Sequence, residues 1–299
     1  MRVMTALRAG VRAVGRMRGL WWVLYLCNLA FAGLLAAPVF GLLGRWLDYS
    51  LYAEELRKKF EPQVIAEWLY AAPVVPPLLL PLLLAGATLY LPLSIFLTSG
   101  TLALFNAPPA RFTLAAFFQA CGRHFFGLLR LFLLSLPFYV LALAVYAGLG
   151  RLAEGRLQDL TVEWPAALVQ WGRVVVALSL LAAVNLVFDY ARIFYVAEGG
   201  PRAWRAAGHA ARFVLAHPLR APGLYALIAL IGLAVWGVYL LVAGTLGRLA
   251  GAPAVLLFLL QQLFILARLG VRLLFLSAQV QLYKGLRPAV APPEFYADY

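Results

Sequence analysis

Long apolar runs separated by shorter polar stretches dominate the pattern along this chain. Runs of about 18 residues or more occur six times, near residues 20–43, 77–104, 128–149, 169–197, 224–247 and 254–283. As a helix, each run is long enough to cross a hydrocarbon layer of about 30 Å. The pattern therefore predicts an all-α integral membrane protein with six transmembrane helices, in a single polytopic membrane domain over residues 1–299.

Short basic stretches precede the first, third and fifth runs. Residues 5–31, 115–141 and 202–228 each begin with an amphipathic segment and continue into an apolar run. In the first, Leu7, Val11 and Val14 fall on one helical face and arginines on another, which is typical of a helix in the membrane interface. The even-numbered runs each end in a polar stop: LFNAPP, VAEGGP and YKGLRP.

These patterns predict three parallel repeats, each an amphipathic interfacial helix plus a transmembrane hairpin. The first repeat covers residues 1–110, the second 111–200 and the third 201–288, and a polar tail follows at 289–299. In the second span, where several prolines free backbone groups, we expect Ser94, Thr98 and Thr101 to satisfy those groups.

Composition supports a bilayer as the surrounding solvent. Hydrophobic residues make up 64% of the 299 and charged residues 12%, whereas soluble domains have about 45–50% and about 25%. A water-soluble core cannot bury such a surplus. Cys27 lies in the first span and Cys121 in the second basic stretch, so the sequence indicates no disulfide framework.

The net charge of +13 is unevenly distributed. Arginines crowd into the N-terminal stretch and the second and fourth linkers, whereas the first and third linkers are mixed or slightly acidic. By the positive-inside rule both termini are cytoplasmic, which indicates a multi-pass protein of the inner (plasma) membrane. Basic linkers that face anionic lipid explain the charge better than nucleic acid does. The expected partners are therefore membrane lipids with anionic headgroups and no nucleic acid.

The fourth span carries charged residues inside an apolar run. Asn185, Asp189 and Arg192 are spaced i, i+4 and i+7, so they share one helix face and Arg192 can reach back to the carboxylate. Asp189 is the only acidic residue within any predicted span. The sixth span supplies a candidate partner, because Arg268 and Arg272 form a stripe at helical spacing. Gln261 and Gln279 extend this stripe.

Three interpretations of this Asp/Arg cluster stay open. The first is a structural ion pair, with the other guanidinium groups reaching toward the interface, that holds the helices in register. The second is a cationic pocket in the inner leaflet in which Arg268 or Arg272 binds an anionic headgroup or amphiphile in a bidentate manner. The third is a proton or ion pathway, which usually needs more than one buried acid.

Other chemistry finds no support in the sequence. His124, His209 and His217 lie in the basic stretches without the spacing of metal ligands, and no phosphate-binding loop, dinucleotide fingerprint or GxSxG elbow occurs. We therefore expect no metal, no cofactor and no enzymatic activity. Aromatic residues near the span ends are typical of interfacial belts: Trp21, Trp22, Tyr25, Trp171, Tyr195, Trp236 and Tyr283.

The segment FDYARIFYVAEGGPRAWRAAGHAARFVLAHP, residues 188–218, resembles a pattern of uncharacterised bacterial six-span membrane proteins. These are similar to the membrane domain attached to some glycerophosphodiester phosphodiesterases. In the pattern an acid, a small residue and an arginine end an even-numbered span, and an Ala-rich amphipathic segment leads into the next. The resemblance implies the architecture and an association with lipids. We expect no catalytic residue to carry over, because the chain shows no counterpart of that enzyme's soluble domain.

Together these observations predict a non-enzymatic inner-membrane protein, an accessory or scaffold subunit of a membrane complex. Its inner-leaflet Arg/Asp cluster would hold an anionic lipid headgroup. The alternative is a transporter or permease subunit for an amphiphilic or anionic solute, which would need a water-accessible cavity lined by Asn185, Arg268 and Arg272. An intramembrane enzyme is a more distant third.

Overall fold

The computed structural model describes residues 2–47, 66, 75–157, 163–248 and 254–286, and the regular structure of these residues is helical. The polar tail predicted at 289–299 lies outside them. The helices are α1 (Val3–Arg16), α2 (Arg18–Leu47), α5 (Val75–Asn106), α6 (Leu114–Leu157), α7 (Glu163–Ala197), α8 (Ala203–Ala216), α9 (Arg220–Arg248) and α10 (Ala254–Leu286).

Six of these helices are long and apolar enough to cross a membrane, with mean hydropathies between 1.7 and 2.5. The candidate spans are Arg18–Arg45, Leu79–Asn106, Leu114–Leu152, Ala167–Ala197, Arg220–Leu246 and Val255–Leu286. Each corresponds to one of the predicted apolar runs. The prediction of an all-α, multi-pass membrane protein with six spans is therefore confirmed.

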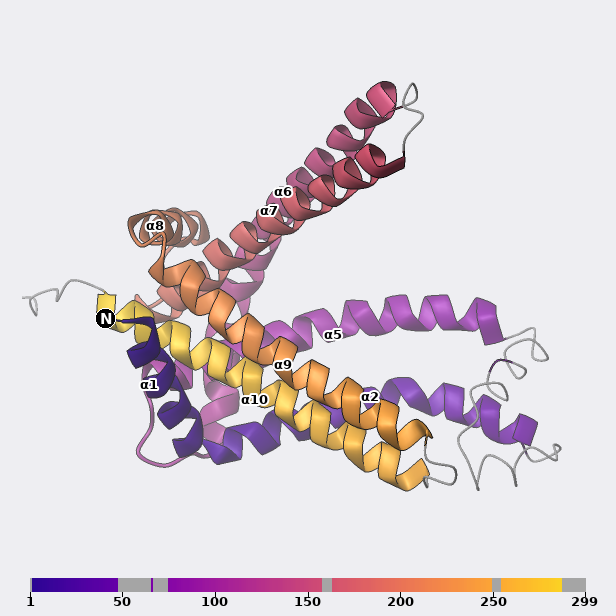
Figure 1. Ribbon diagram of the computed structural model, residues 1–299. Coiled ribbons are helices and arrows are strands. Elements are labelled where there is room, and N and C mark those ends of the chain that lie inside the picture. The colour runs from indigo at the N-terminus through magenta and orange to yellow at the C-terminus, as the bar shows by residue number, and fades with distance from the viewer. Residues whose placement is uncertain (1, 48–65, 67–74, 158–162, 249–253, 287–299) are drawn as a thin grey trace, which may run out of the picture.

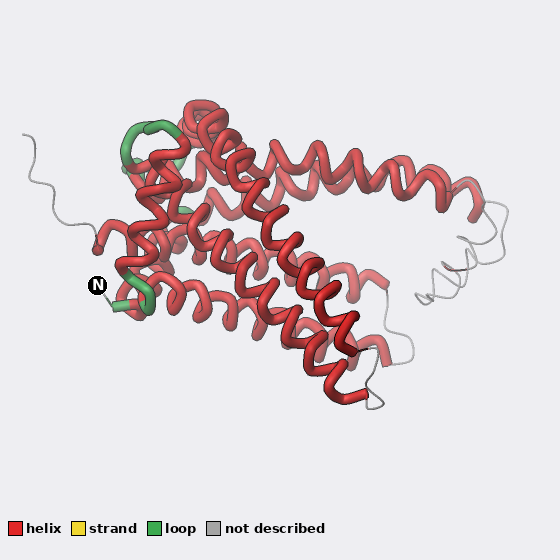
Figure 2. Tube along the Cα trace, turned by 90° about the horizontal axis from the view of Figure 1, so that it is seen from above, coloured by secondary structure: helices red, strands yellow, loops and turns green. Residues whose placement is uncertain are grey.

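All of the helices meet at one end of the molecule and separate toward the other (Figure 1). We call the meeting point the vertex; it comprises α1, α8, the first turns of α6, the connections at 107–113 and 198–202, and the end of α10. Figure 2 shows from a second direction that three separate hairpins leave it: α2 with α5, α6 with α7, and α9 with α10. The three basic stretches thus lie at the same end.

The buried core is concentrated at the vertex and in the adjoining halves of the spans. Its fully buried side chains come from many helices and include Leu20, Leu102, Leu131, Leu224 and Leu273. Toward the other end, large apolar side chains are exposed on each hairpin, among them Phe40, Leu83, Leu141, Leu178 and Leu241. Hydrocarbon suits these surfaces, because lipid tails are as apolar as the side chains themselves.

Helices α1 and α8 resemble each other in length and in the joint with the span that follows. Both have 14 residues and end at a residue with non-helical φ/ψ, −112°/47° at Met17 and −130°/58° at His217. Pro218 explains the second break, because the residue before a proline disfavours the helical conformation. Both helices bury small residues: Ala6 and Gly10 in α1, Ala206 and Ala210 in α8.

The second basic stretch differs from this expectation, because it does not form a separate interfacial helix. It is the beginning of α6, which runs for 44 residues without a break. No proline occurs between Leu114 and Pro137 to interrupt it. The segment packs on α5 instead, where Phe117 and Cys121 are buried and the Ser99 hydroxyl donates a hydrogen bond to the Cys121 carbonyl at 2.8 Å.

Helix α1 packs on α10, so that the first helix of the chain contacts the last. At Gly10 an added Cβ would lie 2.9 Å from Ala278, and the Ser277 hydroxyl donates to the Gly10 carbonyl at 3.2 Å. The buried face of α1 is therefore the one with small residues. The predicted apolar face turns partly outward, since Val11 is 54% exposed.

Helix α7 ends at two glycines in the left-handed region, Gly199 and Gly200, with φ of 72° and 90°. Glycine adopts this conformation without steric cost, which explains why the VAEGGP stop ends the helix here. Helix α5 ends differently. The Lys284 ammonium of α10 donates to the carbonyl of Asn106, an acceptor that the last turn leaves free.

Candidate functional site

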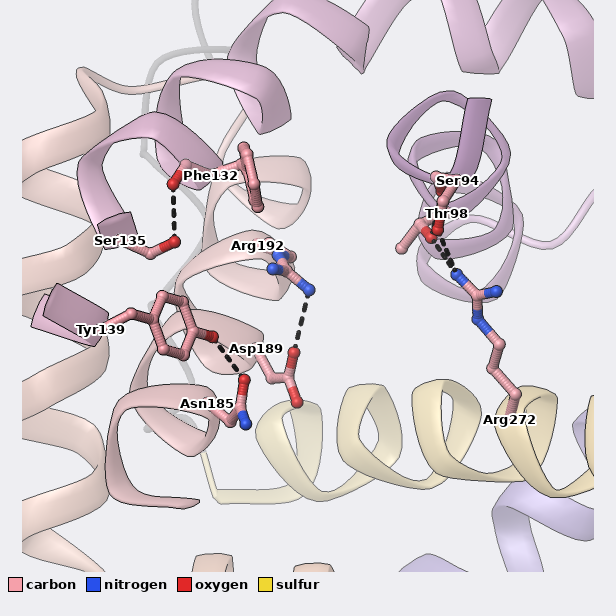
Figure 3. Close-up of polar contacts among 9 residues, drawn as sticks. All are labelled: Ser94, Thr98, Phe132, Ser135, Tyr139, Asn185, Asp189, Arg192 and Arg272. Carbon is pink, nitrogen blue, oxygen red and sulfur yellow. Dashed lines mark hydrogen bonds and ion pairs between the residues drawn. The ribbon is translucent and has the colours of Figure 1, made fainter. Parts of the chain in front are cut away.

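The three polar residues predicted on the fourth span lie on one face of α7. Arg192 Nη1 donates to Asp189 Oδ1 at 3.1 Å, one helical turn back (Figure 3). The side chains of the arginine and the aspartate are 25% and 16% exposed. The Asn185 side-chain oxygen accepts a hydrogen bond from the Tyr139 hydroxyl of α6. The pair is therefore partly buried where α6 and α7 meet, at the base of their hairpin.

Arg272 of α10 is held by hydroxyl groups of α5. Its Nη2 donates to Ser94 Oγ at 3.0 Å and to Thr98 Oγ1 at 2.9 Å (Figure 3). The Thr98 hydroxyl also donates to the Ser94 carbonyl at 2.6 Å, and the Thr101 hydroxyl to the Leu97 carbonyl at 2.8 Å. The bonded carbonyls, those of Ser94 and Leu97, are not the ones that Pro81 and Pro92 leave free four residues before them, so these bonds do not fill the expected role. Ser94 and Thr98 instead hold Arg272, which the sequence did not indicate.

The candidate partnership between Asp189 and the arginines of the sixth span is not what the structure shows. Within the described residues the ion pair of Asp189 is with Arg192 of its own helix. Neutral hydroxyls bind the Arg272 guanidinium, so its charge has no directly paired carboxylate there. The helix spacing that allowed the Asp189–Arg192 pair was visible in the sequence, whereas the position of α5 was not.

Arg268 lies apart from the cluster, although it precedes Arg272 by only one turn. It is exposed and lines a different cavity of about 400 Å³ between α9 and α10, together with Gly232 and Trp236. The predicted stripe on α10 therefore changes surroundings along its length. Gln279, nearest the vertex, is buried, and Gln261 at the far end is exposed. The helices separate toward that end, so no neighbour covers the whole stripe (Figure 1).

Between these contacts lies a cavity of about 390 Å³, which we call the arginine cavity. Its polar wall consists of Ser94 and Thr98 of α5, Arg192 of α7 and Arg272 of α10. Its apolar wall consists of Ala87, Leu91, Ile95, Leu128 and Phe132, with the Tyr90 ring. Figure 3 shows the two arginines on opposite sides of this space. Two guanidinium groups and one carboxylate leave the cluster with an excess of positive charge.

Two other polar side chains are buried near the pair. Gln279 of α10 lies beside the Asp189 carboxyl group without a hydrogen bond of normal geometry. The Tyr190 hydroxyl on α7 is also buried and, among the described residues, has no hydrogen-bond partner. Buried polar atoms are usually hydrogen-bonded. The side chains near the Asp189 carboxylate therefore include buried polar atoms without a hydrogen-bond partner among the described residues, on Gln279 of α10 and on Tyr190, whose ring packs on Phe213 of α8.

Two aromatic residues predicted for an interfacial belt connect α2 with α10 instead. The Trp21 indole donates to the Leu266 carbonyl at 2.9 Å, and the Tyr25 hydroxyl donates to Gln262 at 2.8 Å. Nearby, the Tyr90 hydroxyl donates to Asn28 at 2.7 Å. The polar residues Asn28 and Gln262 inside apolar runs were the available signal for such contacts. Trp22, Trp171 and Trp236 are exposed, as belt residues would be.

The histidines take part in packing at the vertex. His209 stacks on Phe194 with ring centroids 4.8 Å apart, and a His217 ring nitrogen lies 3.0 Å from the Phe213 carbonyl. In the described part of the chain, no three His, Cys, Asp or Glu side chains come together in a group that could hold a metal ion.

Comparison with known proteins found no matching protein family, no similar curated protein and no similar solved structure. The resemblance to the membrane domain of glycerophosphodiester phosphodiesterases therefore stays a prediction from residues 188–218.

Proposed function

We propose that this chain is a non-enzymatic membrane protein that binds an anionic amphiphile in the arginine cavity, as an accessory or scaffold subunit of the inner membrane. The observation that carries this proposal is the bonding of Arg272. Its guanidinium lies within a candidate span, and its hydrogen-bond partners are neutral hydroxyls. A charge in the bilayer is costly unless it is paired or serves a function. An anionic group in the adjoining cavity would provide the missing counter-charge.

The geometry of Arg272 suits a carboxylate or a phosphate. A guanidinium has five N–H donors in a planar fork, and the two hydroxyls of α5 engage only Nη2. The other donors are left for a bidentate contact with a planar or tetrahedral anion. Arg192 lines the opposite wall, where Asp189 already offsets its charge. Arg272 would therefore bind the anion, and Arg192 would add a second, weaker contact.

The apolar wall of the cavity indicates that the ligand has a hydrocarbon part. Leu91 and Ile95 of α5 and Leu128 and Phe132 of α6 line it, so the cavity lies between these two helices. Arg272 is 14 residues before the end of α10, which is about 21 Å along the helix. A ligand that reaches this depth from the bilayer would be an amphiphile rather than a small water-soluble anion.

A transporter or permease subunit is the second candidate, but the geometry favours it less. Its predicted cavity required Asn185, Arg268 and Arg272 together, and Arg268 lies in a different cavity. Asn185 is bonded to Tyr139 and is not among the residues that line the arginine cavity. A purely structural ion pair would account for Asp189 and Arg192, but it leaves Arg272 without an explanation.

The proposal includes the three-repeat architecture, because the arginine cavity lies where the inward spans of the repeats meet. Two features support repeats. Helix α1 packs on α10, the start of α6 on α5 and α8 on α7, so each basic segment contacts the inward span that precedes it around the vertex. Residues of α1 and the start of α2 in the first unit also have an identical or similar residue at the equivalent position of α8 and α9 in the third unit. These pairs are Ala6 and Ala206, Gly10 and Ala210, Leu24 and Leu224, and Tyr25 and Tyr225.

The inward spans also carry polar residues at matching positions. Each inward span has a small buried residue: Gly100 on α5, Ala191 on α7 and Ala278 on α10. In all three spans, the residue six positions before it and the residue one position after it are polar. These positions hold Ser94 and Thr101 on α5, Asn185 and Arg192 on α7, and Arg272 and Gln279 on α10. One residue of each pair, Ser94, Arg192 and Arg272, lines the arginine cavity and provides a polar part of the proposed binding site. With the basic stretches at the vertex, the proposed orientation places both termini on the cytoplasmic side.

The test compares the lipids that remain bound to purified wild type, Arg272→Ala and Arg268→Ala, measured by native mass spectrometry. Arg268 is the matched control, because it is one turn away on the same helix and outside the arginine cavity. We expect Arg272→Ala to lose a bound anionic amphiphile that wild type and Arg268→Ala keep. Arg272→Lys, which retains the charge without the planar fork, should bind it more weakly than wild type. Equal occupancy in wild type and Arg272→Ala would remove the proposal.

A further inference from the structure

Two grooves of similar size lie at the vertex, away from the arginine cavity. The first, of about 660 Å³, lies between α1, the connection from α5 to α6 and α10; we call it the α1 groove. The second, of about 630 Å³, lies between the start of α6 and the ends of α5 and α7; we call it the α6 groove. Arg12 and Arg16 line the first groove, and Arg123 and His124 line the second.

The two grooves are built in the same way from different parts of the chain. In each, a basic segment forms one wall, the inward span on which that segment packs forms another, and the end of the next inward span completes it. For the α1 groove these parts are α1, Gln281 of α10 and Phe105 with the connection after α5. For the α6 groove they are the start of α6, Asn106 of α5 and Tyr195 with the glycines after α7.

The third equivalent position, between α8, α7 and α10, is filled by the protein's own aromatic side chains. His209 stacks on Phe194 at an interplanar angle of 9°, and Tyr283 contacts both Phe194 and Phe213, with centroids 6.3 and 5.4 Å apart. What is left beside α8 is a hollow of about 350 Å³ lined by residues of α8 alone. Of these three equivalent positions among the described helices, two are therefore open grooves and the third is closed.

The arginines of the two open grooves are exposed and have no acidic partner in the part of the chain that is described. Arg12 makes only a long hydrogen bond, 3.4 Å, to the Arg8 carbonyl. Glu198 is the acidic residue nearest in sequence to the α6 groove. It accepts a hydrogen bond from Tyr283 at 3.5 Å and does not line the groove. Both grooves thus present positive charge to whatever enters them.

We propose that the α1 groove and the α6 groove each bind the headgroup phosphate of an acidic phospholipid from the leaflet at the vertex. Position favours this ligand, because the grooves lie at the ends of the candidate spans, where headgroups are found, and basic residues there attract anionic lipid. The floor of the α1 groove also has an apolar part, with Met17, Phe105 and Phe112, that suits the glycerol and first acyl carbons. Neither groove shares a residue with the arginine cavity.

The test is a titration of the full chain in detergent with phosphatidylglycerol, followed by native mass spectrometry, with phosphatidylcholine of the same chains as the neutral comparison. Three double or single variants are compared: Arg12→Gln with Arg16→Gln, Arg123→Gln, and the control Arg205→Gln with Arg212→Gln on α8. The first two should each lose one phosphatidylglycerol site, with affinity about tenfold lower. The control should bind like wild type, because Arg205 and Arg212 line only the smaller hollow on α8, which no second helix encloses.

Several outcomes would overturn this proposal. One is a loss in the α8 control as large as in the groove variants, which would show general attraction to positive charge. Another is equal binding of phosphatidylcholine, and a third is displacement of the lipid by inorganic phosphate at the same concentration. If a variant does not fold, photo-crosslinking of phosphatidylglycerol to the wild-type chain decides instead, and label on α8 in place of α1 and α6 would contradict the assignment. Arg272→Ala should leave both sites intact, so the two proposals can fail separately.

Discussion

The vertex and the far halves of the three hairpins are built from similar residues but are packed by different means. At the vertex, glycines lie against neighbouring helices: an added Cβ would come within 2.3 Å of Cys121 at Gly100 and within 2.0 Å of Tyr195 at Gly127. In the far halves, Gly33, Gly148 and Gly237 have open space around them. Close glycine contacts also occur in the far halves, at Gly86 against Leu35 and at Gly150 against Arg173, but there the neighbouring atoms belong to flexible side chains. At the vertex Gly10 lies against the backbone of Ala278, and Gly100 lies against the Phe117 carbonyl.

This difference shows which part of the molecule determines how the helices pack against one another. Between spans, an apolar side chain gains little by leaving lipid for protein, so close packing of small residues and hydrogen bonds must hold the helices together. Both occur at the vertex, in the contacts of Gly10 with Ala278 and Ser99 with Cys121, and in the adjoining halves of the spans, in the contact of Arg272 with Ser94 and Thr98. The far halves mainly have to be apolar and long enough to cross the bilayer.

Replacing Asp189 with asparagine should have the largest effect on stability. The change removes the carboxylate that pairs with Arg192, so that neither guanidinium group of the arginine cavity then has a directly paired carboxylate. Breaking a partly buried pair in this way costs on the order of 3 kcal/mol, which thermal melting in detergent would detect as a clear decrease. Arg268→Gln, a charge change on an exposed residue, is the control and should melt like wild type. Unchanged melting of Asp189→Asn would contradict the structural importance of the pair.

The two halves of helix α6 provide a direct comparison with leucines. Leu131 is 0% exposed near the vertex, whereas Leu143 in the far half is 57% exposed. Leu131→Ala should lower the free energy of unfolding by about 2 kcal/mol because it leaves a packing defect. Leu143→Ala should change it by less than about 0.5 kcal/mol, as expected away from packed sites. Similar losses for the two variants would show that the far half packs as closely as the vertex.

Glycine substitutions sharpen the comparison further. Gly100→Ala places a methyl group 2.3 Å from Cys121 Sγ and 2.9 Å from the Phe117 ring, so it should destabilise the protein by about 1–2 kcal/mol through overpacking. Gly33→Ala meets open space and should be neutral or stabilising, by up to about 1 kcal/mol, because alanine favours the helix. Melting temperatures of the two variants should move in opposite directions, and a shared decrease would count against the contrast.

The smallest effect is expected from the indoles at the start of α2. Trp21→Phe removes the hydrogen bond to the Leu266 carbonyl and should cost about 1 kcal/mol. Its neighbour Trp22 is exposed, so Trp22→Phe should leave the melting temperature unchanged. If Trp22→Phe were the more harmful change, the belt would contribute more to stability than the contact between α2 and α10.

Part of the candidate site could be predicted because it lies within one helix. The spacing of Asn185, Asp189 and Arg192 determines that they share a face of α7, and the ion pair follows from a separation of three residues. The partners of Arg272 could not be found this way, since Thr98 is 174 residues distant in the chain. Nor does helical spacing show that Arg268 faces a different cavity, because its surroundings depend on how α9 packs against α10.

Sequence alone determined the number of spans, the surrounding solvent and which residues share a helix face, because these follow from local hydrophobicity and the helical repeat. Only the tertiary structure decided which of those faces meet, that the second basic segment continues into its span, and that two of the three equivalent positions at the vertex are open. In a membrane, lipid can cover the apolar residues on any side of a helix, so the apolar pattern does not specify which helices become neighbours. The choice of neighbour therefore rests on a few glycines and polar contacts between residues far apart in the chain.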